Sequence, residues 1–285
     1  MTPRHLSRTQ VPNPVLWYFW GMRQPLRIVV VLLGLLTFSA CVGTPGTESA
    51  SGTSPSVGDS ADATGSAPER PGSYREVTFP AQDGATRSGR LFGDGSVAVV
   101  LSYMGRSGDS QDDWKTFAES LAEHGYQALT YAREADSEQN DFVDHWRDVL
   151  GAATFLRDHG AETVIAGGAS IGAVASLHAA EQPDNGINAV LWLAGLHETD
   201  SYEFSKADVA RISCPIMFVS GEGDAYGSAE SARLLHDWAP TSELLFIESY
   251  RHGTDILTHD ETSARTLSQA MLEFVKRMED QDATC

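Results

Sequence analysis

The sequence has few cysteines: Cys41, Cys214 and Cys285 are the three among its 285 residues. Cys214 lies in the apolar, strand-like run 212–219, where a small buried thiol is common, and Cys285 ends a polar tail. No two of them have the spacing of zinc ligands. The sequence therefore predicts neither a disulfide framework nor a zinc site.

Basic residues are also scarce. There are 20 Lys and Arg against 39 Asp and Glu, which gives a formal net charge of −19. A charge of that sign repels phosphate backbones, so the composition argues against a nucleic-acid partner. The acidic excess is better explained by solubility than by a chosen partner.

The apolar run Ile28–Leu36 is too short to span a bilayer comfortably. Arg23 and Arg27 precede it and small residues follow, which together indicate a secretory signal peptide over residues 1–40. Met22 begins a more typical signal than Met1, which predicts that translation starts at Met22. Removing the four basic residues of this segment would change the net charge from −19 to −23.

The end of this segment, Phe38-Ser39-Ala40-Cys41, resembles a bacterial lipobox, although Phe38 stands where leucine is usual. The resemblance implies that Cys41 is lipidated and becomes the mature N-terminus, so that the protein is held on the outer face of the cell membrane. The alternative is an ordinary signal peptide with an incidental cysteine. Residues 41–72 then form a flexible tether, because Thr44–Gly72 is rich in Gly, Ser, Thr, Ala and Pro.

Residues 73–285 are long enough for one domain with a sizeable core. An antiparallel entry pair is predicted around the turn at Gln82-Asp83-Gly84, and strand-like and helix-like segments alternate after it. This alternation predicts a mostly parallel, doubly wound α/β sheet with helices on both faces. The predicted strands are 74–79, 87–92, 97–103, 126–131, 163–166, 188–194, 215–220 and 243–247, and the predicted helices are 112–124, 142–159, 171–181, 228–238 and 261–278.

The motif Gly168-Ala169-Ser170-Ile171-Gly172 directly follows a predicted strand and opens a predicted helix. A nucleophile on such a sharp turn forces strained backbone, so small residues are needed two positions before and after it. Gly168 and Gly172 meet that need. The context therefore predicts that Ser170 is a nucleophile.

A serine hydroxyl needs a base, usually a histidine oriented by a carboxylate, on loops after later strands. Gly221-Glu222-Gly223-Asp224 follows one such strand and His252-Gly253 follows the last. We predict Asp224 as the acid and His252 as the base. Three other residues remain open: His259 for the base, and Glu198 or Asp200 for the acid. Glu222 lies two residues too early in the turn.

From about Tyr74 to Met278 the chain resembles the α/β-hydrolase family of serine esterases, lipases and dienelactone hydrolase-like enzymes. The resemblance is carried by the serine motif, the Asp224 turn and His252-Gly253. It implies an oxyanion hole of backbone N–H groups, one from Ile171 and a second from Met104 or Gly105. Members often have His-Gly followed by that second donor, whereas this chain has Tyr103-Met104-Gly105.

These features predict a serine hydrolase that cleaves small carboxylic esters at the cell envelope, with no metal or organic cofactor. An amidase or peptidase using the same residues, and a non-catalytic binding lipoprotein, are the alternatives. The short stretch between Ala194 and Ile212 leaves little room for a cap. We therefore expect an open, shallow site, with Tyr103, Trp192 and Tyr226 as candidates to line it.

Overall fold

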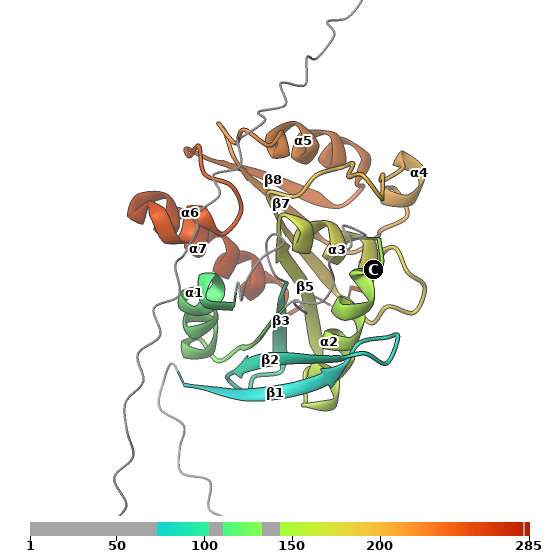
Figure 1. The fold of residues 1–285 in the computed structure, drawn as a ribbon, viewed down its shortest axis with the longest axis vertical. Helices are drawn as coiled ribbons and strands as arrows, with labels where there is room; N and C mark the ends of the chain where they lie inside the picture. Colours follow the sequence, from blue (N-terminus) through green and yellow to red (C-terminus); the bar gives the residue numbers. More distant parts are fainter. Residues whose placement is uncertain (1–72, 103–110, 133–142, 282) are drawn as a thin grey trace, which may run out of the picture. The chain divides into compact units, whose positions relative to one another are not determined.

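The computed structural model describes residues 73–102, 111–132, 143–281 and 283–285 (Figure 1). The predicted signal peptide, Cys41 and the tether lie outside these residues, as do Met104 and Gly105. Eight strands are described: β1 Tyr74–Pro80, β2 Thr86–Phe92, β3 Val97–Ser102, β4 Gln127–Tyr131, β5 Thr163–Ala169, β6 Ala189–Leu193, β7 Ile216–Gly221 and β8 Ser242–Ile247. Seven helices are described: α1 Gln111–Glu123, α2 Trp146–Asp158, α3 Ile171–Ala180, α4 Lys206–Val209, α5 Ser228–Trp238, α6 Asp255–His259 and α7 Glu261–Arg277.

The strands form one sheet in the order β1-β2-β4-β3-β5-β6-β7-β8. β1 and β2 pair antiparallel, β2 pairs antiparallel with β4, and every further pair is parallel. The predicted fold class, a mostly parallel doubly wound sheet, is confirmed. Since parallel strands share a direction, the loops after β5, β7 and β8 all leave from the same edge of the sheet.

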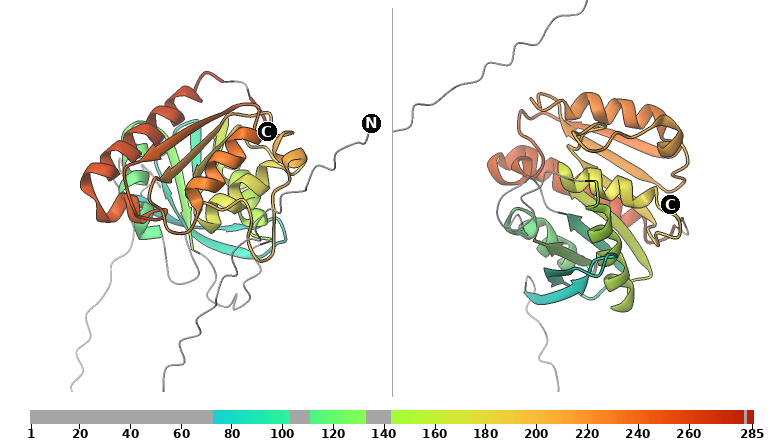
Figure 2. Two further views of the ribbon diagram at one scale, coloured as in Figure 1. Left: turned by 90° about the horizontal axis from the view of Figure 1, so that it is seen from above. Right: turned by 45° about the vertical axis from the view of Figure 1, so that its right-hand side comes forward.

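Helices cover both faces of this sheet (Figure 2). One apolar core contains residues of α2, α3, α4 and α5, and a second contains residues of α1, α6 and α7. β3 contributes alternate side chains to the two cores, with Ala98 and Val100 in the first and Val97, Val99 and Leu101 in the second. Burial on both faces explains why this strand is a continuous apolar run in the sequence.

Two short helices were not predicted. α4 has four residues and α6 has five, which is too short for a helical periodicity to be visible. A capping signal for α4 was present: the Ser205 hydroxyl accepts a hydrogen bond from the Asp208 N–H and donates one to its carboxylate. α2 begins at Trp146 rather than at residue 142, because the chain just before it forms turns instead.

The sequence predicted no disulfide framework, but one disulfide bond is present. Cys214 is buried and bonded to Cys285, across 71 residues of sequence. The C-terminal tail lies along the amino ends of β6 and β7, where the Cys285 N–H donates to the Ile187 carbonyl (2.9 Å) and the Asn188 side chain donates to the Ala283 carbonyl (2.7 Å). The tail is polar in sequence, but its backbone hydrogen bonds fix it against the domain.

None of the helices in the described ranges is long and apolar enough to cross a membrane.

Candidate active site

Ser170 lies on a tight turn between β5 and α3. Its backbone has φ 54° and ψ −115°, in a region that non-glycine residues rarely adopt. A Cβ on Gly168 would lie 2.4 Å from the carbonyl of Gly172, so the turn excludes a larger residue there. The backbone strain and the close approach are the features expected of a serine presented at the carboxyl edge of a sheet.

His252 and Asp224 reach Ser170 from the loops after β8 and β7. The His252 Nε2 atom lies 2.8 Å from the Ser170 hydroxyl oxygen, and His252 Nδ1 lies 2.7 Å from Asp224 Oδ2. If Nδ1–H donates to the carboxylate, Nε2 has a free lone pair that can accept the serine proton. The three side chains therefore form one hydrogen-bonded line.

Glycines let the two loops pack closely. A Cβ on Gly221 would lie 2.8 Å from the carbonyl oxygens of Ser249 and Arg251, and one on Gly223 would lie 2.2 Å from the Tyr250 ring. The Asp224 loop is therefore pressed against the His252 loop, which accounts for the two glycines in the sequence of the acidic turn.

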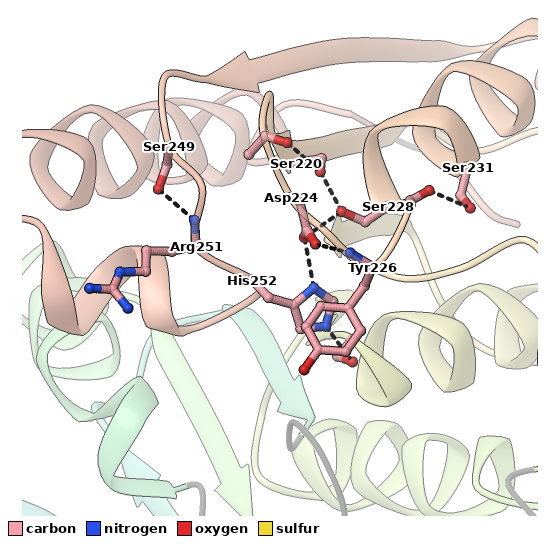
Figure 3. A network of polar contacts seen from close by, with 11 residues as sticks. Ser220, Asp224, Tyr226, Ser228, Ser231, Ser249, Arg251 and His252 are labelled. Atoms are coloured by element: carbon pink, nitrogen blue, oxygen red, sulfur yellow. Dashed lines mark hydrogen bonds and ion pairs between the residues drawn. The ribbon is translucent and has the colours of Figure 1, made fainter. Parts of the chain in front are cut away.

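Further polar groups surround the Asp224 carboxylate (Figure 3). The Ser228 hydroxyl donates to Oδ2 at 2.5 Å, the Tyr226 N–H donates to Oδ1 at 2.8 Å, and Ser220 contacts Ser228 at 2.6 Å. Burial alone would raise the pKa of Asp224, but the hydrogen bonds from His252, Ser228 and Tyr226 lower it below its ordinary value. Asp224 is thus held as a carboxylate beside the imidazole.

Ser228 and Ser220 were missed by the sequence analysis. Ser228 is the first residue of α5 and lies four residues after Asp224. A serine at that spacing is too common to be singled out from sequence, so only the fold reveals its contact with the acid.

Tyr226 packs against the imidazole. Figure 3 shows the two rings next to each other. The ring centroid of Tyr226 lies 4.4 Å from that of His252, and 69% of the tyrosine is exposed. Trp192, named with it as a pocket candidate, is fully buried in the core instead, and Tyr103 lies outside the described residues.

A cavity of about 710 Å³ opens beside this line of residues. Ile171, the residue after the serine, is part of its wall. As the first residue of α3, Ile171 has an N–H with no carbonyl partner inside the helix. The wall consists of Ile171, Leu196, His197, Glu198, Thr199, Asp200, Tyr226, Gly227 and Ser231.

The other candidates for base and acid are elsewhere. His259 ends α6 and contacts Thr258 and Asp255, and Glu222 is exposed to solvent. Glu198 and Asp200 lie in the cavity wall, while Asp224 has the contact with His252.

No cluster of three or more metal-binding side chains occurs in the described part of the chain. The connection between β6 and β7 contains only the short helix α4, so it forms no large cap.

Comparison with known proteins adds a fold assignment. No family model matches the chain, and no curated protein matches it. Solved structures do match: an esterase of Pyrococcus furiosus has a TM-score of 0.61 at 15% identity, covering 72% of this chain and 91% of its own. The fold is that of the α/β-hydrolases.

Two further structures with this α/β-hydrolase fold are similar. Esterase 2 of Thermogutta terrifontis, solved after phosphoramylation by tabun, has a TM-score of 0.61 at 18% identity and covers 76% of this chain and 98% of its own. A dienelactone hydrolase of Anabaena variabilis has a TM-score of 0.58 at 19% identity, covering 72% and 98%. At these identities the likeness is one of fold.

Proposed function

We propose that this protein is a serine hydrolase that cleaves carboxylic esters through a covalent acyl-enzyme, and that it is exported and lipid-anchored at the cell membrane. The observation that supports the chemistry best is the hydrogen-bonded line from Ser170 through His252 to Asp224. Esterases and a dienelactone hydrolase among the structural neighbours support the choice of ester as substrate.

In the proposed first half-reaction, His252 Nε2 accepts the proton of the Ser170 hydroxyl as its oxygen attacks the ester carbonyl carbon. Asp224 stabilises the imidazolium that forms and fixes the ring by its bond to Nδ1. The Ile171 N–H donates to the oxyanion, and a second donor is expected from Met104 or Gly105. Each such donor contributes about 3 kcal/mol in comparable enzymes.

The C–O bond then breaks, His252 gives its proton to the leaving alkoxide, and the acyl group stays on Ser170. In the second half-reaction, His252 takes a proton from water and the resulting hydroxide attacks the acyl carbon. The acid leaves as the proton returns to the Ser170 oxygen. The bonds and protons balance without an added cofactor.

Hydrolysis of p-nitrophenyl butyrate tests this proposal. We expect Ser170→Ala and His252→Ala each to lower kcat/KM by about 10³-fold or more, since residues that act as a unit fail together. Ser96→Ala is the matched control, because Ser96 is exposed and immediately precedes β3, at the opposite edge of the sheet. Circular dichroism of each variant checks that it is folded.

A fluorophosphonate probe gives a second measurement that does not depend on the substrate chosen. We expect it to modify the Ser170 peptide in the wild-type protein and to react far more slowly with His252→Ala. Activity unchanged in both active-site variants, or labelling at another serine, would overturn the assignment. The matching p-nitroanilide separates an esterase from an amidase.

A further inference from the structure

The described wall of the cavity beside Ser170 carries negative charge. Two of its wall residues, Glu198 and Asp200, are exposed carboxylates, and no Lys or Arg is among the nine described residues that line it. Glu198 has His197 as its neighbour: the His197 Nε2 atom lies 4.0 Å from Glu198 Oε2. In the described residues, no ion pair neutralises Asp200.

The segment that carries these carboxylates is ordered by its own hydrogen bonds. The Thr199 N–H donates to the Tyr202 carbonyl at 2.8 Å, and the Phe204 N–H donates to the His197 carbonyl at 2.9 Å. The Thr199 hydroxyl exchanges two further bonds with the backbone of Tyr202, each at 3.1 Å. The backbone that carries the two carboxylates is therefore fixed in the wall of the cavity.

Tyr226 supplies a second kind of cation-attracting group to the same cavity. Tyr226 is exposed although its ring packs on His252. The face of an aromatic ring is electrostatically negative and attracts cations, as the two carboxylates do. A carboxylate pair and an exposed aromatic ring in one cavity are the groups expected to bind an ammonium ion.

We propose that this cavity is a specificity subsite that binds a positively charged ammonium group of the ester substrate. The inference rests on the proposed function, because the cavity adjoins Ile171, the residue after the nucleophile. A substrate whose carbonyl is held at Ser170 would extend its acyl or alcohol part into the cavity. Glu198, Asp200 and Tyr226 would then act as binding residues that favour cationic over neutral substrates.

Isosteric esters that differ only in charge test the proposal in two arms. In the alcohol arm, 2-(trimethylammonio)ethyl butyrate is compared with 3,3-dimethylbutyl butyrate. In the acyl arm, the p-nitrophenyl ester of 4-(trimethylammonio)butyrate is compared with that of 5,5-dimethylhexanoate. We expect kcat/KM to favour the cationic member by about tenfold in one arm at low salt, and by less at high salt.

The double variant Glu198→Gln/Asp200→Asn should reduce that cationic-to-neutral ratio to about one, since it removes charge with little change in volume. Glu162→Gln is the matched control, because Glu162 is exposed at the amino end of β5, away from the cavity. It should leave the ratio unchanged. Tyr226→Leu should lower the ratio in part, through loss of the ring face.

The outcomes separate the two proposals. If no ester of either arm is hydrolysed and the fluorophosphonate does not label Ser170, the proposed function fails. If neutral esters are hydrolysed and both ratios are near one in the wild type, the ammonium subsite is wrong while the hydrolase proposal stands. A ratio that favours the cation but survives the double variant also overturns the role of these carboxylates.

Discussion

Asp224 is a buried acid whose charge depends on its neighbours. The His252 imidazole, the Ser228 hydroxyl and the Tyr226 N–H all donate to it, and together they outweigh the effect of burial on its pKa. These donors come from the Asp224 turn, the start of α5 and the His252 loop. A carboxylate held by three segments keeps the imidazole in one orientation, which the proposed proton transfer requires.

The sequence predicted which residue types meet, but it left the choice of acid open. Asp224, Glu222, Glu198 and Asp200 all follow strands that end at the same edge of the sheet. Packing of Gly221 and Gly223 against the His252 loop brings Asp224 to the imidazole. That packing depends on backbone distances in space, which residue spacing along the chain does not contain.

Glu181 is a buried carboxyl whose effect on the free energy of unfolding can be measured. It caps α3 and accepts a hydrogen bond from the Tyr202 hydroxyl, and its Oε1 atom is buried without a hydrogen bond. Burial raises its pKa from 4.5 to about 7. Because the folded state holds this proton more tightly than the unfolded state, the carboxyl lowers stability as pH rises from 4.5 to about 7.

His178 opposes this effect. Its ring stacks on Tyr202 at 4.0 Å, and burial lowers its pKa from 6.5 to about 4. The stability contributed by the neutral imidazole is present above pH 6.5 and is lost as pH falls to about 4. The two groups therefore offset each other between pH 4.5 and 6.5, and only Glu181 acts above that range.

We predict that Glu181→Gln stabilises the protein more at about pH 8 than at about pH 5, with the gain growing by at most about 3 kcal/mol. Glutamine can still accept from Tyr202, but it carries no charge to bury. Urea unfolding of the variant and the wild type at both pH values measures the difference. Glu162→Gln should show no such pH dependence, and an equal gain for Glu181→Gln at both pH values would contradict the prediction.

At the scale of elements, alternating strands and helices were readable because each long element has its own pattern of apolar residues. The antiparallel pair β1 and β2 and the helix Ser228–Trp238 were predicted nearly to the residue. α4 and α6 were missed because each has less than two turns. The Cys214–Cys285 bond was missed because tertiary packing, and no local pattern, brings the tail to the start of β7.

This disulfide ties the C-terminal tail to the domain. Besides the covalent bond, the Ser213 hydroxyl donates to the Thr284 carbonyl at 3.1 Å, and Asn188 reaches both Ala283 and the Val164 N–H. All these contacts lie at or before the amino ends of strands β5, β6 and β7. The candidate active site lies at the carboxyl ends, so the tail should affect stability without affecting catalysis.

We predict that Cys285→Ser lowers the free energy of unfolding by about 4 kcal/mol, because closing a loop of 71 residues restricts the unfolded chain. Ester hydrolysis by the folded variant should be unchanged. Urea unfolding with and without a reductant measures this effect. The reductant should destabilise the wild type and leave Cys285→Ser unaffected; equal midpoints for the oxidised wild type and the variant would refute the prediction.

At the scale of the whole molecule, the Cys214–Cys285 disulfide supports the proposed extracytoplasmic location. Disulfides persist in oxidising compartments and are rare in the cytosol. The net charge of −19 disfavours adsorption to anionic lipid surfaces, so any stable membrane attachment needs a hydrophobic anchor. The proposed anchor is a lipid on Cys41, followed by the tether to residue 72.

We predict that Cys41→Ser moves the protein from the membrane fraction to the soluble fraction, because it removes the residue that is proposed to be acylated. Without its lipid chains the protein has no stable membrane anchor. Fractionation of cells followed by immunoblotting measures the distribution, and Triton X-114 partitioning tests for the lipid itself. A high-salt wash should leave the wild type in the membrane, which separates an anchor from electrostatic adsorption.

Cys285→Ser is the matched cysteine control and should stay with the membrane. If Cys41→Ser also stays there, the attachment does not depend on Cys41, and the uncleaved apolar segment Ile28–Leu36 becomes the better candidate for the anchor.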